Sequence, residues 1–274
     1  MSAMVTFTTD GPVAEALVDN PPVNATSAGV RQGLVDAVAA FNADPALKVL
    51  IIRCAGRTFI AGADIKEFGK PMVGPNLTEA IAMLDASTKP VIAAVHGTVL
   101  GGGFEVALAC HYRIADPATR FGFPEVKLGL LPGAGGTQRT PRLAGLATTI
   151  ELVTTGKQIN AKKALEAGLI DRVAEGDLAD AARAYANELA TAGTGPRSAG
   201  TLPMPEDNPE LFAEARKNLG RTMRGQTAPL LALDAIRLGY DYPFAEALER
   251  EYAACKEDIA GPQSKALRHV FAAE

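Results

Sequence analysis

The sequence KVLIIRC at residues 48–54, followed by PVIAAV at residues 90–95, decides the fold that we expect. Each run has the length of a strand and contains a continuous apolar stretch, VLII at residues 49–52 and PVIAAV at 90–95, instead of alternating with polar residues. Strands of this kind are typical of sheets covered by helices on both faces, so the sequence predicts an α/β protein. Two more strands are expected at residues 5–8 and 13–18, joined by a turn at Asp10 and Gly11.

Helix signals separate the predicted strands. Thr26 or Ser27 is suited to cap a helix at its N-terminus. The apolar side chains after this cap recur with the helical period, at Val30, Leu34, Val38 and Phe41. The first half of the chain therefore alternates between strands and helices.

The same alternation continues beyond residue 110. A strand is expected at residues 112–115, and Asn160 predicts a helix that ends at Gly168. A strand at residues 169–173 follows, and Asp177 predicts the start of another helix.

The composition then changes. Residues 192–208 are rich in glycine and proline and indicate a linker or long loop. Only helical patterns come after it, at residues 209–223, 228–239, 243–259 and 263–273. We therefore expect an α/β core at residues 1–192, then a linker and C-terminal helical region at residues 193–274.

Charge and cysteine content exclude several classes of protein. The 27 basic and 31 acidic residues give a net charge of −4, so no cationic field favours nucleic acid or an anionic membrane. The three cysteines form no CxxC pair, which argues against a disulfide scaffold or a cysteine-rich zinc site. No secretory signal and no apolar run of about 18 residues is visible, so we expect a cytoplasmic protein with no membrane attachment.

A triple glycine, Gly101 to Gly103, precedes the helical pattern FEVALAC at residues 104–110. Free N–H groups at a helix N-terminus bind an anion, or an oxygen that becomes one. Glu105 would lie in the first turn of this helix, where an acid also simply complements the helix dipole. A phosphate-binding P-loop is excluded because no Gly-Lys-Ser/Thr follows the glycines.

A second segment, IAGADIK at residues 60–66, has the same pattern. A strand ends, the chain turns through Gly62, and a helix is expected to start near Ala63 or Asp64. Its N–H groups would supply the second half of an oxyanion pocket, in which two amide donors stabilise one thioester oxygen. The alternative for this segment taken alone is an ordinary turn capped by Asp64.

Glu125 is a second candidate acid. It lies in FGFPE at residues 121–125, among apolar neighbours that favour the protonated form of a carboxyl group. Two carboxyl groups in different surroundings can divide the roles of acid and base. Glu105 and Glu125 are on different predicted elements, so the sequence leaves open whether they meet or serve as separate structural or exposed glutamates.

Other catalytic constellations are not found in the sequence. No serine lies in G-x-S-x-G, which argues against a hydrolase triad. The three histidines form neither HxH nor HxxxH, so no metal site is expected. The glycines at 133–136 lack the full G-x-G-x-x-G after a buried strand, which argues against nicotinamide binding.

Three segments together resemble the enoyl-CoA hydratase/isomerase (crotonase) superfamily, in order and in spacing. They are FIAGADIKEF at residues 59–68, PVIAAVHGTVLGGGFEVALACHYRIAD at 90–116 and FGFPEVKLGLLPGAGGTQR at 121–139. The resemblance covers about residues 5–192. The segments NPPVNA at 20–25, CHYRIA at 110–115 and the C-terminal SKALRHVFAAE further resemble the hydratase half of bifunctional fatty-acid oxidation enzymes.

This resemblance implies a crotonase-like spiral of ββα turns with helices at the C-terminus. It implies that the amides of Ala63 and Gly102 form the oxyanion hole, that Glu105 and Glu125 are the catalytic glutamates, and that the backbone of Gly133 holds the water. The residues implied to contact coenzyme A are Val23, Ala61, Ile65 and Lys66.

The presence of both glutamates favours hydration over the other reactions of the superfamily. The expected function is addition of water to trans-2-enoyl-CoA thioesters in fatty-acid β-oxidation. The alternatives are a Δ3-Δ2-enoyl-CoA isomerase and an inert acyl-CoA-binding relative. No metal or redox cofactor is expected, because coenzyme A arrives as part of the substrate. The resemblance also implies a homo-oligomer, a trimer or hexamer, or else a 3-hydroxyacyl-CoA dehydrogenase as a fused domain or partner.

Overall fold

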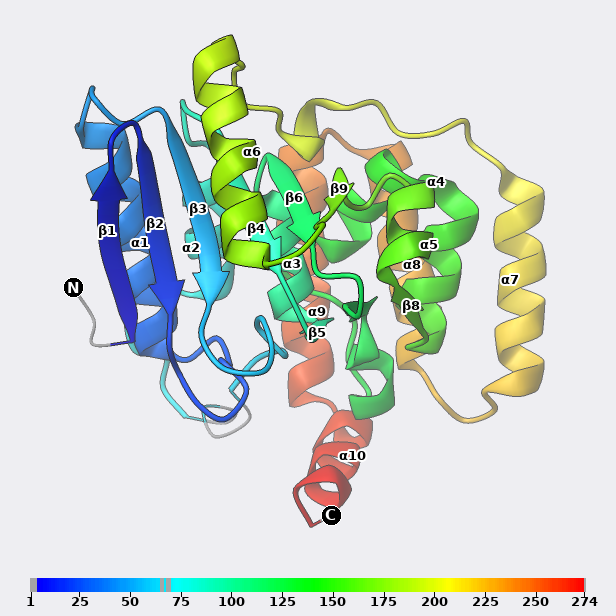
Figure 1. Cartoon of the computed structure of the whole chain (residues 1–274). Coiled ribbons are helices and arrows are strands. Elements are labelled where there is room, and N and C mark those ends of the chain that lie inside the picture. Colours follow the sequence, from blue (N-terminus) through cyan, green and yellow to red (C-terminus); the bar gives the residue numbers. More distant parts are fainter. Residues whose placement is uncertain (1–3, 65–66, 68–69, 274) are drawn as a thin grey trace. The chain divides into compact units, whose positions relative to one another are not determined.

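The computed structural model describes residues 4–64, 67 and 70–273 (Figure 1). The chain forms two compact units. Unit 1 comprises residues 1–121 and 159–201, and unit 2 comprises residues 122–158 and 202–274. Each unit therefore contains two separate stretches of the sequence, and the division at residues 192 and 193 stays a prediction.

Unit 1 contains a six-stranded sheet with the order β1-β2-β3-β4-β6-β9. β1 and β2 are antiparallel, and every later pair is parallel. The predicted α/β class is thus confirmed. The strands are β1 (Val5–Asp10), β2 (Val13–Val18), β3 (Val49–Cys54), β4 (Val91–Val95), β6 (Tyr112–Ala115) and β9 (Arg172–Val173).

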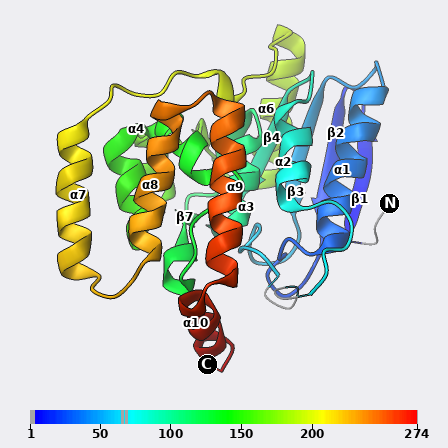
Figure 2. The same ribbon diagram turned by 180° about the vertical axis from the view of Figure 1, so that it is seen from behind.

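Helices cover both faces of this sheet, as the apolar strands predicted. On one face, Val49 and Ile51 of β3 pack in a core with Ala182 and Tyr185 of α6 (Leu178–Ala192), which lies in front of the sheet in Figure 1. Leu50 alternates to the opposite face and is also fully buried. On that side lie α1 (Ala28–Ala43), α2 (Leu77–Asp85) and α3 (Gly102–Ala109), as Figure 2 shows.

The strand predicted at residues 169–173 is shorter than expected. Gly168 has a φ of +79°, and the Leu169 N–H still donates to the carbonyl of Ala164 in the preceding helix α5 (Ala161–Glu166), at 2.9 Å. This helix ending occupies the first residues of the predicted strand. Pairing with β6 therefore begins only at Arg172.

The cap of α1 also differs from the prediction. Ser27 occupies the N-cap position, but its side chain makes no capping hydrogen bond. The side chain of Thr26 donates to the Gly62 carbonyl instead of accepting from the helix. The Ala28 N–H instead donates to Glu67 Oε1 at 2.7 Å. The Ser27 hydroxyl accepts a hydrogen bond from the side chain of Asn20 at 3.2 Å, so this oxygen is used outside the helix.

Unit 2 is mainly helical, which confirms the helical patterns expected near the C-terminus. α4 begins shortly after a 3₁₀ helix, η2, and four helices follow in the second stretch of the unit. Their bounds are η2 (Pro124–Leu128), α4 (Gly136–Thr155), α7 (Pro209–Thr222), α8 (Ala228–Asp241), α9 (Phe244–Ala260) and α10 (Pro262–Ala273). The short elements of the chain are β5 (Thr98–Leu100), β7 (Arg120–Gly122), β8 (Gln158–Asn160) and η3 (Ala199–Thr201).

Asp258, near the end of α9, makes the stability of the chain depend on pH. Burial and then the neighbouring Glu257 raise the pKa of Asp258 to about 6. Its Oδ2 atom is buried and has no hydrogen-bond partner within the described part of the chain. Because the folded protein holds this proton more tightly than the unfolded chain, stability falls as the pH rises from about 4 to about 6.

We therefore expect Asp258→Asn to stabilise the protein at pH 8 by about 1 kcal/mol, after allowance for the partial exposure of the group. The gain should shrink as the pH is lowered toward 4, where aspartate is protonated in both states. Urea unfolding midpoints of the wild type and the variant across this range measure the difference. Glu249→Gln, on the exposed side of the same helix, is the control. A gain that is equal at every pH would contradict the assignment.

Candidate active site

Two loop segments of unit 1 run side by side and carry the predicted oxyanion-hole amides. Ala61 and Leu100 form a parallel bridge, and the Leu100 N–H donates to the Ile60 carbonyl at 3.3 Å. Ala63 lies two residues after Ala61, and Gly102 lies two residues after Leu100. Among the described residues, neither the Ala63 N–H nor the Gly102 N–H has a hydrogen-bond acceptor. Both donors can therefore serve an incoming oxygen atom, and their role stays a prediction.

The Gly102 amide opens the helix that the sequence predicted. Gly101 is the N-cap of α3, with a φ of +53°, and α3 begins at Gly102. Ala63 and Asp64 lie in irregular backbone, and the Glu67 N–H donates to the Asp64 carbonyl at 3.0 Å. The helix expected to start near Ala63 or Asp64 falls partly on residues outside the described ones and stays a prediction. The Gly62 carbonyl accepts from the Thr26 N–H at 3.0 Å, and this loop contact holds the backbone just before Ala63.

Gly103 allows α3 to approach this loop closely. A Cβ atom at Gly103 would lie 2.0 Å from the Ile60 carbonyl oxygen, a distance that no real side chain tolerates. This close contact between Gly103 and Ile60 holds the start of α3 against residues 60–63. Glycine is required here for space.

We expect Gly103→Ala to lower the free energy of unfolding by about 1–3 kcal/mol, because the added methyl group forces α3 away from Ile60. Any reaction that uses both amide donors should slow as well, because the two donors move apart. Gly195→Ala is the matched control, because no atom lies within 4 Å of a Cβ placed there. Equal urea midpoints for the two variants would refute the close-packing explanation.

Glu105 lies in the first turn of α3 and is 2% exposed. Its Oε2 atom would be 4.0 Å from a Cβ built at Gly102, so the carboxyl group points back toward the predicted oxyanion amide. All residues of α3 are buried. A buried carboxyl group beside a free N–H of a helix start is suited to act on a group bound there, in addition to complementing the helix dipole.

Glu125 belongs to unit 2, where it is the second residue of η2. Pro124 opens this 3₁₀ helix, and Gly129 closes it with a φ of +66°. The Oε2 atom of Glu125 is shielded from solvent, and the neighbouring Phe123 and Val126 are buried. The local fold therefore places Glu125 next to buried apolar residues in the sequence, and its pairing with Glu105 stays a prediction.

Gly133 lies in the loop of unit 2 that leads into α4. A Cβ at this position would be 2.5 Å from Cys255 Sγ and 2.6 Å from Cys255 Cβ, so α9 leaves no room for a side chain. The predicted water-holding backbone is thus packed directly against a helix. Its role toward water stays a prediction.

Two of the four residues implied to contact coenzyme A are brought together in unit 1. The Ala61 N–H donates to the Val23 carbonyl at 3.1 Å, and both residues are partly exposed. Asn24, with a φ of +52°, anchors this segment through hydrogen bonds to the Ala55 and Thr58 carbonyls. Ile65 and Lys66 lie outside the described residues.

With the fold and these groups in place, comparison with known proteins identifies the family. The enoyl-CoA hydratase/isomerase family matches residues 8–199, which is more than half of the chain. The chain belongs to the enoyl-CoA hydratase/isomerase family. The predicted crotonase resemblance is thereby confirmed.

Relatives of this family member cover most of its length. A "peroxisomal bifunctional enzyme" of Danio rerio is 39% identical over 96% of the chain, which spans only 37% of that relative. The carnitinyl-CoA hydratase of Mycobacterium avium has a similar structure, with a TM-score of 0.73 at 29% identity over 98% of this chain and 95% of that one. An enoyl-CoA hydratase of Bacillus anthracis gives a TM-score of 0.64 at 28% identity, over 94% and 92% of the two chains.

The structure of this enoyl-CoA hydratase/isomerase family member also contains an ion pair that the sequence analysis missed. Arg31, which is 4% exposed, donates to Glu67 Oε2 at 2.7 Å and to the Thr26 carbonyl at 2.6 Å. Thr26 in turn binds the Gly62 carbonyl. The ion pair thus supports the backbone segment that leads to Ala63. The sequence could have indicated it, because Arg31 is a charged residue on the buried face of α1.

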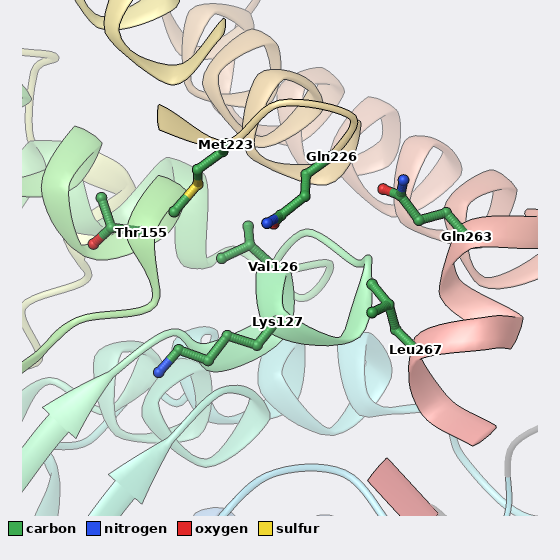
Figure 3. A pocket seen from close by; sticks show the side chains of 7 residues that line it. All are labelled: Val126, Lys127, Thr155, Met223, Gln226, Gln263 and Leu267. Carbon is green, nitrogen blue, oxygen red and sulfur yellow. The ribbon is translucent and has the colours of Figure 1, made fainter. Parts of the chain in front are cut away.

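A pocket in unit 2 has a volume of about 380 Å³ and adjoins η2 (Figure 3). Of the predicted site residues that the structure describes, none lines it, although Val126 directly follows Glu125. Its wall is formed by η2, the end of α4, the turn after α7, and α10. The lining side chains are Val126, Lys127, Thr155, Met223, Gln226, Gln263 and Leu267.

Metal sites and membrane spans were also searched in residues 4–64, 67 and 70–273. Within these residues, no group of three or more His, Cys, Asp or Glu side chains is arranged to hold a metal ion. Of the helices that the structure describes, none combines the length and the apolar character that crossing a membrane would take.

Proposed function

We propose that the chain is an enoyl-CoA hydratase, which adds water across the 2,3 double bond of trans-2-enoyl-CoA thioesters in fatty-acid β-oxidation. The observation that carries this proposal is the pair of amide N–H groups at Ala63 and Gly102, neither of which has an acceptor among the described residues, with the buried Glu105 near Gly102, in a member of this family. Two convergent amide donors stabilise the negative charge that develops on a thioester oxygen.

The reaction follows from the roles of these groups. The thioester oxygen binds to the Ala63 and Gly102 amides, which makes C3 of the substrate electrophilic. Glu105, ionised, takes a proton from a water molecule that the Gly133 backbone orients, and the water oxygen adds to C3. Glu125, protonated, donates its proton to C2. One water is consumed, and the two carboxyl groups regain their starting states by proton exchange with solvent.

The residues also suit the binding of coenzyme A as part of the substrate. Val23 and Ala61 present a partly exposed apolar edge for the adenine, and Ile65 and Lys66 remain predicted contacts. No metal or redox cofactor enters the proposed steps. Cytoplasmic localisation stays a prediction, since the bifunctional relatives carry the word peroxisomal in their name.

The assembly of the protein is part of the proposal. The chain spans about a third of the bifunctional relatives that it matches. We propose that it acts as a homo-oligomer, a trimer or hexamer, or together with a 3-hydroxyacyl-CoA dehydrogenase as a fused domain or partner. Sedimentation equilibrium of the purified chain measures whether it forms a trimer or a hexamer by itself.

The test of the proposed function is turnover of crotonyl-CoA, followed as the loss of enoyl-thioester absorbance. 3-Hexenoyl-CoA, offered separately, measures the alternative isomerase reaction, because it must lose its 3,4 double bond to gain absorbance. Faster turnover of 3-hexenoyl-CoA would favour the isomerase. Binding of both thioesters without turnover would favour an inert relative.

A further inference from the structure

Helix α4 of unit 2 begins without a cap from its own sequence. Its N-cap is Gly135, which has a φ of +103° and no side chain to accept hydrogen bonds from the first N–H groups. Such groups need an acceptor when they are buried. Gly136 and Thr137, the first residues of α4, are buried, so the acceptor must come from elsewhere in the fold.

Glu251 of α9 supplies this acceptor from 116 residues away. One carboxylate oxygen accepts the Gly135 N–H. The other accepts the Thr137 N–H at 3.0 Å and the Thr137 hydroxyl. Glu251 is 0% exposed, so this carboxylate is wholly committed to the protein interior. A buried carboxylate that receives several N–H and O–H donors holds them at fixed positions.

Cys255 lies one helical turn further along the same face of α9 and contacts the other part of the loop. Its Sγ atom is 3.4 Å from the Leu131 carbonyl, to which the thiol donates, and it fills the space beside Gly133. Glu251 and Cys255 therefore hold the loop from residue 131 to residue 137 on both sides of Gly133. The backbone at Gly133 cannot move independently of α9.

We propose that Glu251 is a positioning residue for hydration. By fixing the amides of Gly135 and Thr137, it holds the backbone of Gly133 where that backbone orients the attacking water. Glu251 itself does not touch the substrate. This inference rests on the proposed function, since it concerns the water that the hydratase adds.

Replacement of Glu251 by glutamine tests the proposal with little change in volume. A glutamine offers one oxygen and one NH₂ group, so a donor would face the donors of Gly135 or Thr137 and displace the loop. We expect kcat for crotonyl-CoA to fall about 10- to 100-fold, with KM within about twofold of the wild type. Glu249→Gln, exposed on the same helix, should leave both constants unchanged.

A second readout separates positioning of water from general damage. A chromophoric enoyl-CoA shifts its absorbance to the red when amide donors polarise its carbonyl group. Because the Ala63 and Gly102 amides belong to unit 1, the shift should be the same in Glu251→Gln as in the wild type. Loss of the shift together with kcat would show a general defect and overturn the proposal, as would a wild-type kcat.

Thr137→Val carries the test if Glu251→Gln does not fold. It removes only the hydroxyl that donates to Glu251, and we expect a loss of kcat of several fold with KM unchanged. Thr137→Ser keeps this hydroxyl and should restore wild-type activity. An unaltered kcat in Thr137→Val would overturn the proposal. Absence of hydration in the wild type would refute the proposed function instead, and is thus distinguishable from failure of this inference.

Discussion

Glutamine at position 125 should lower kcat for crotonyl-CoA hydration by about 10²- to 10⁴-fold. In the proposed reaction, Glu125 gives a proton to C2 of the substrate, and a glutamine amide has no proton of comparable acidity to give. This loss corresponds to about 2.7–5.4 kcal/mol of activation free energy. KM should change little, because the carboxyl group acts in the transition state and not in binding coenzyme A.

A partial reaction identifies the role of Glu125 independently of hydration. A saturated thioester such as butyryl-CoA should exchange a C2 proton with D₂O, since the oxyanion-hole amides stabilise its enolate and Glu125 carries the proton. This exchange needs no addition of water to C3. We expect Glu125→Gln to lose exchange and hydration together, whereas Glu249→Gln should keep both. Exchange at the wild-type rate in Glu125→Gln would refute the assignment.

Much of unit 1 could be predicted from the sequence, because its apolar strands and helix caps are recognisable from neighbouring residues. The strands at residues 49–54 and 91–95 are apolar apart from Arg53, as expected for a sheet buried on both faces, and the structure places helices on each face. Asn160 and Asp177 cap α5 and α6 through their own side chains, which accept N–H groups two or three residues ahead. Such caps are local, so the sequence contains all of the information that they need.

Two helices were missed for different reasons. Asn76 and Glu79 form a capping box at the start of α2, a pattern that could have been recognised from their spacing of three residues. In α4, Pro141 and Gly145 lie inside the helix, and Gly145 breaks it with a φ of +77° and a ψ of +170°. No continuous helical pattern therefore marks α4 in the sequence.

The residues that support the candidate site could not be predicted, because their partners are distant in the sequence. Glu67 caps α1 from 39 residues away, and Glu251 caps the start of α4 from 114 residues beyond Thr137. No periodicity or motif links such positions. The amides of Ala63 and Gly102, by contrast, are implied by a family resemblance that continuous local segments carry, and their role stays a prediction.

Glutamine in place of Glu105 should also reduce hydration by about 10²- to 10⁴-fold, because it cannot take a proton from the attacking water. The expected pattern differs from that of Glu125→Gln in one measurable respect. Exchange of the C2 proton of butyryl-CoA with D₂O uses the oxyanion-hole amides and Glu125, so Glu105→Gln should retain it. If Glu125→Gln loses this exchange and Glu105→Gln keeps it, Glu105 is assigned as the base and Glu125 as the acid.

We expect Glu105→Gln to stay folded. A carboxylate in the first turn of a helix stabilises it by about 0.3–1 kcal/mol, and up to about 2 kcal/mol when partly buried. A domain with about 5–15 kcal/mol of stability stays folded after such a loss. The urea midpoint of Glu105→Gln should confirm this, with Glu166→Gln, an exposed glutamate of unit 1, as the control. If Glu105→Gln is folded and hydrates crotonyl-CoA at the wild-type rate, another group must activate the water.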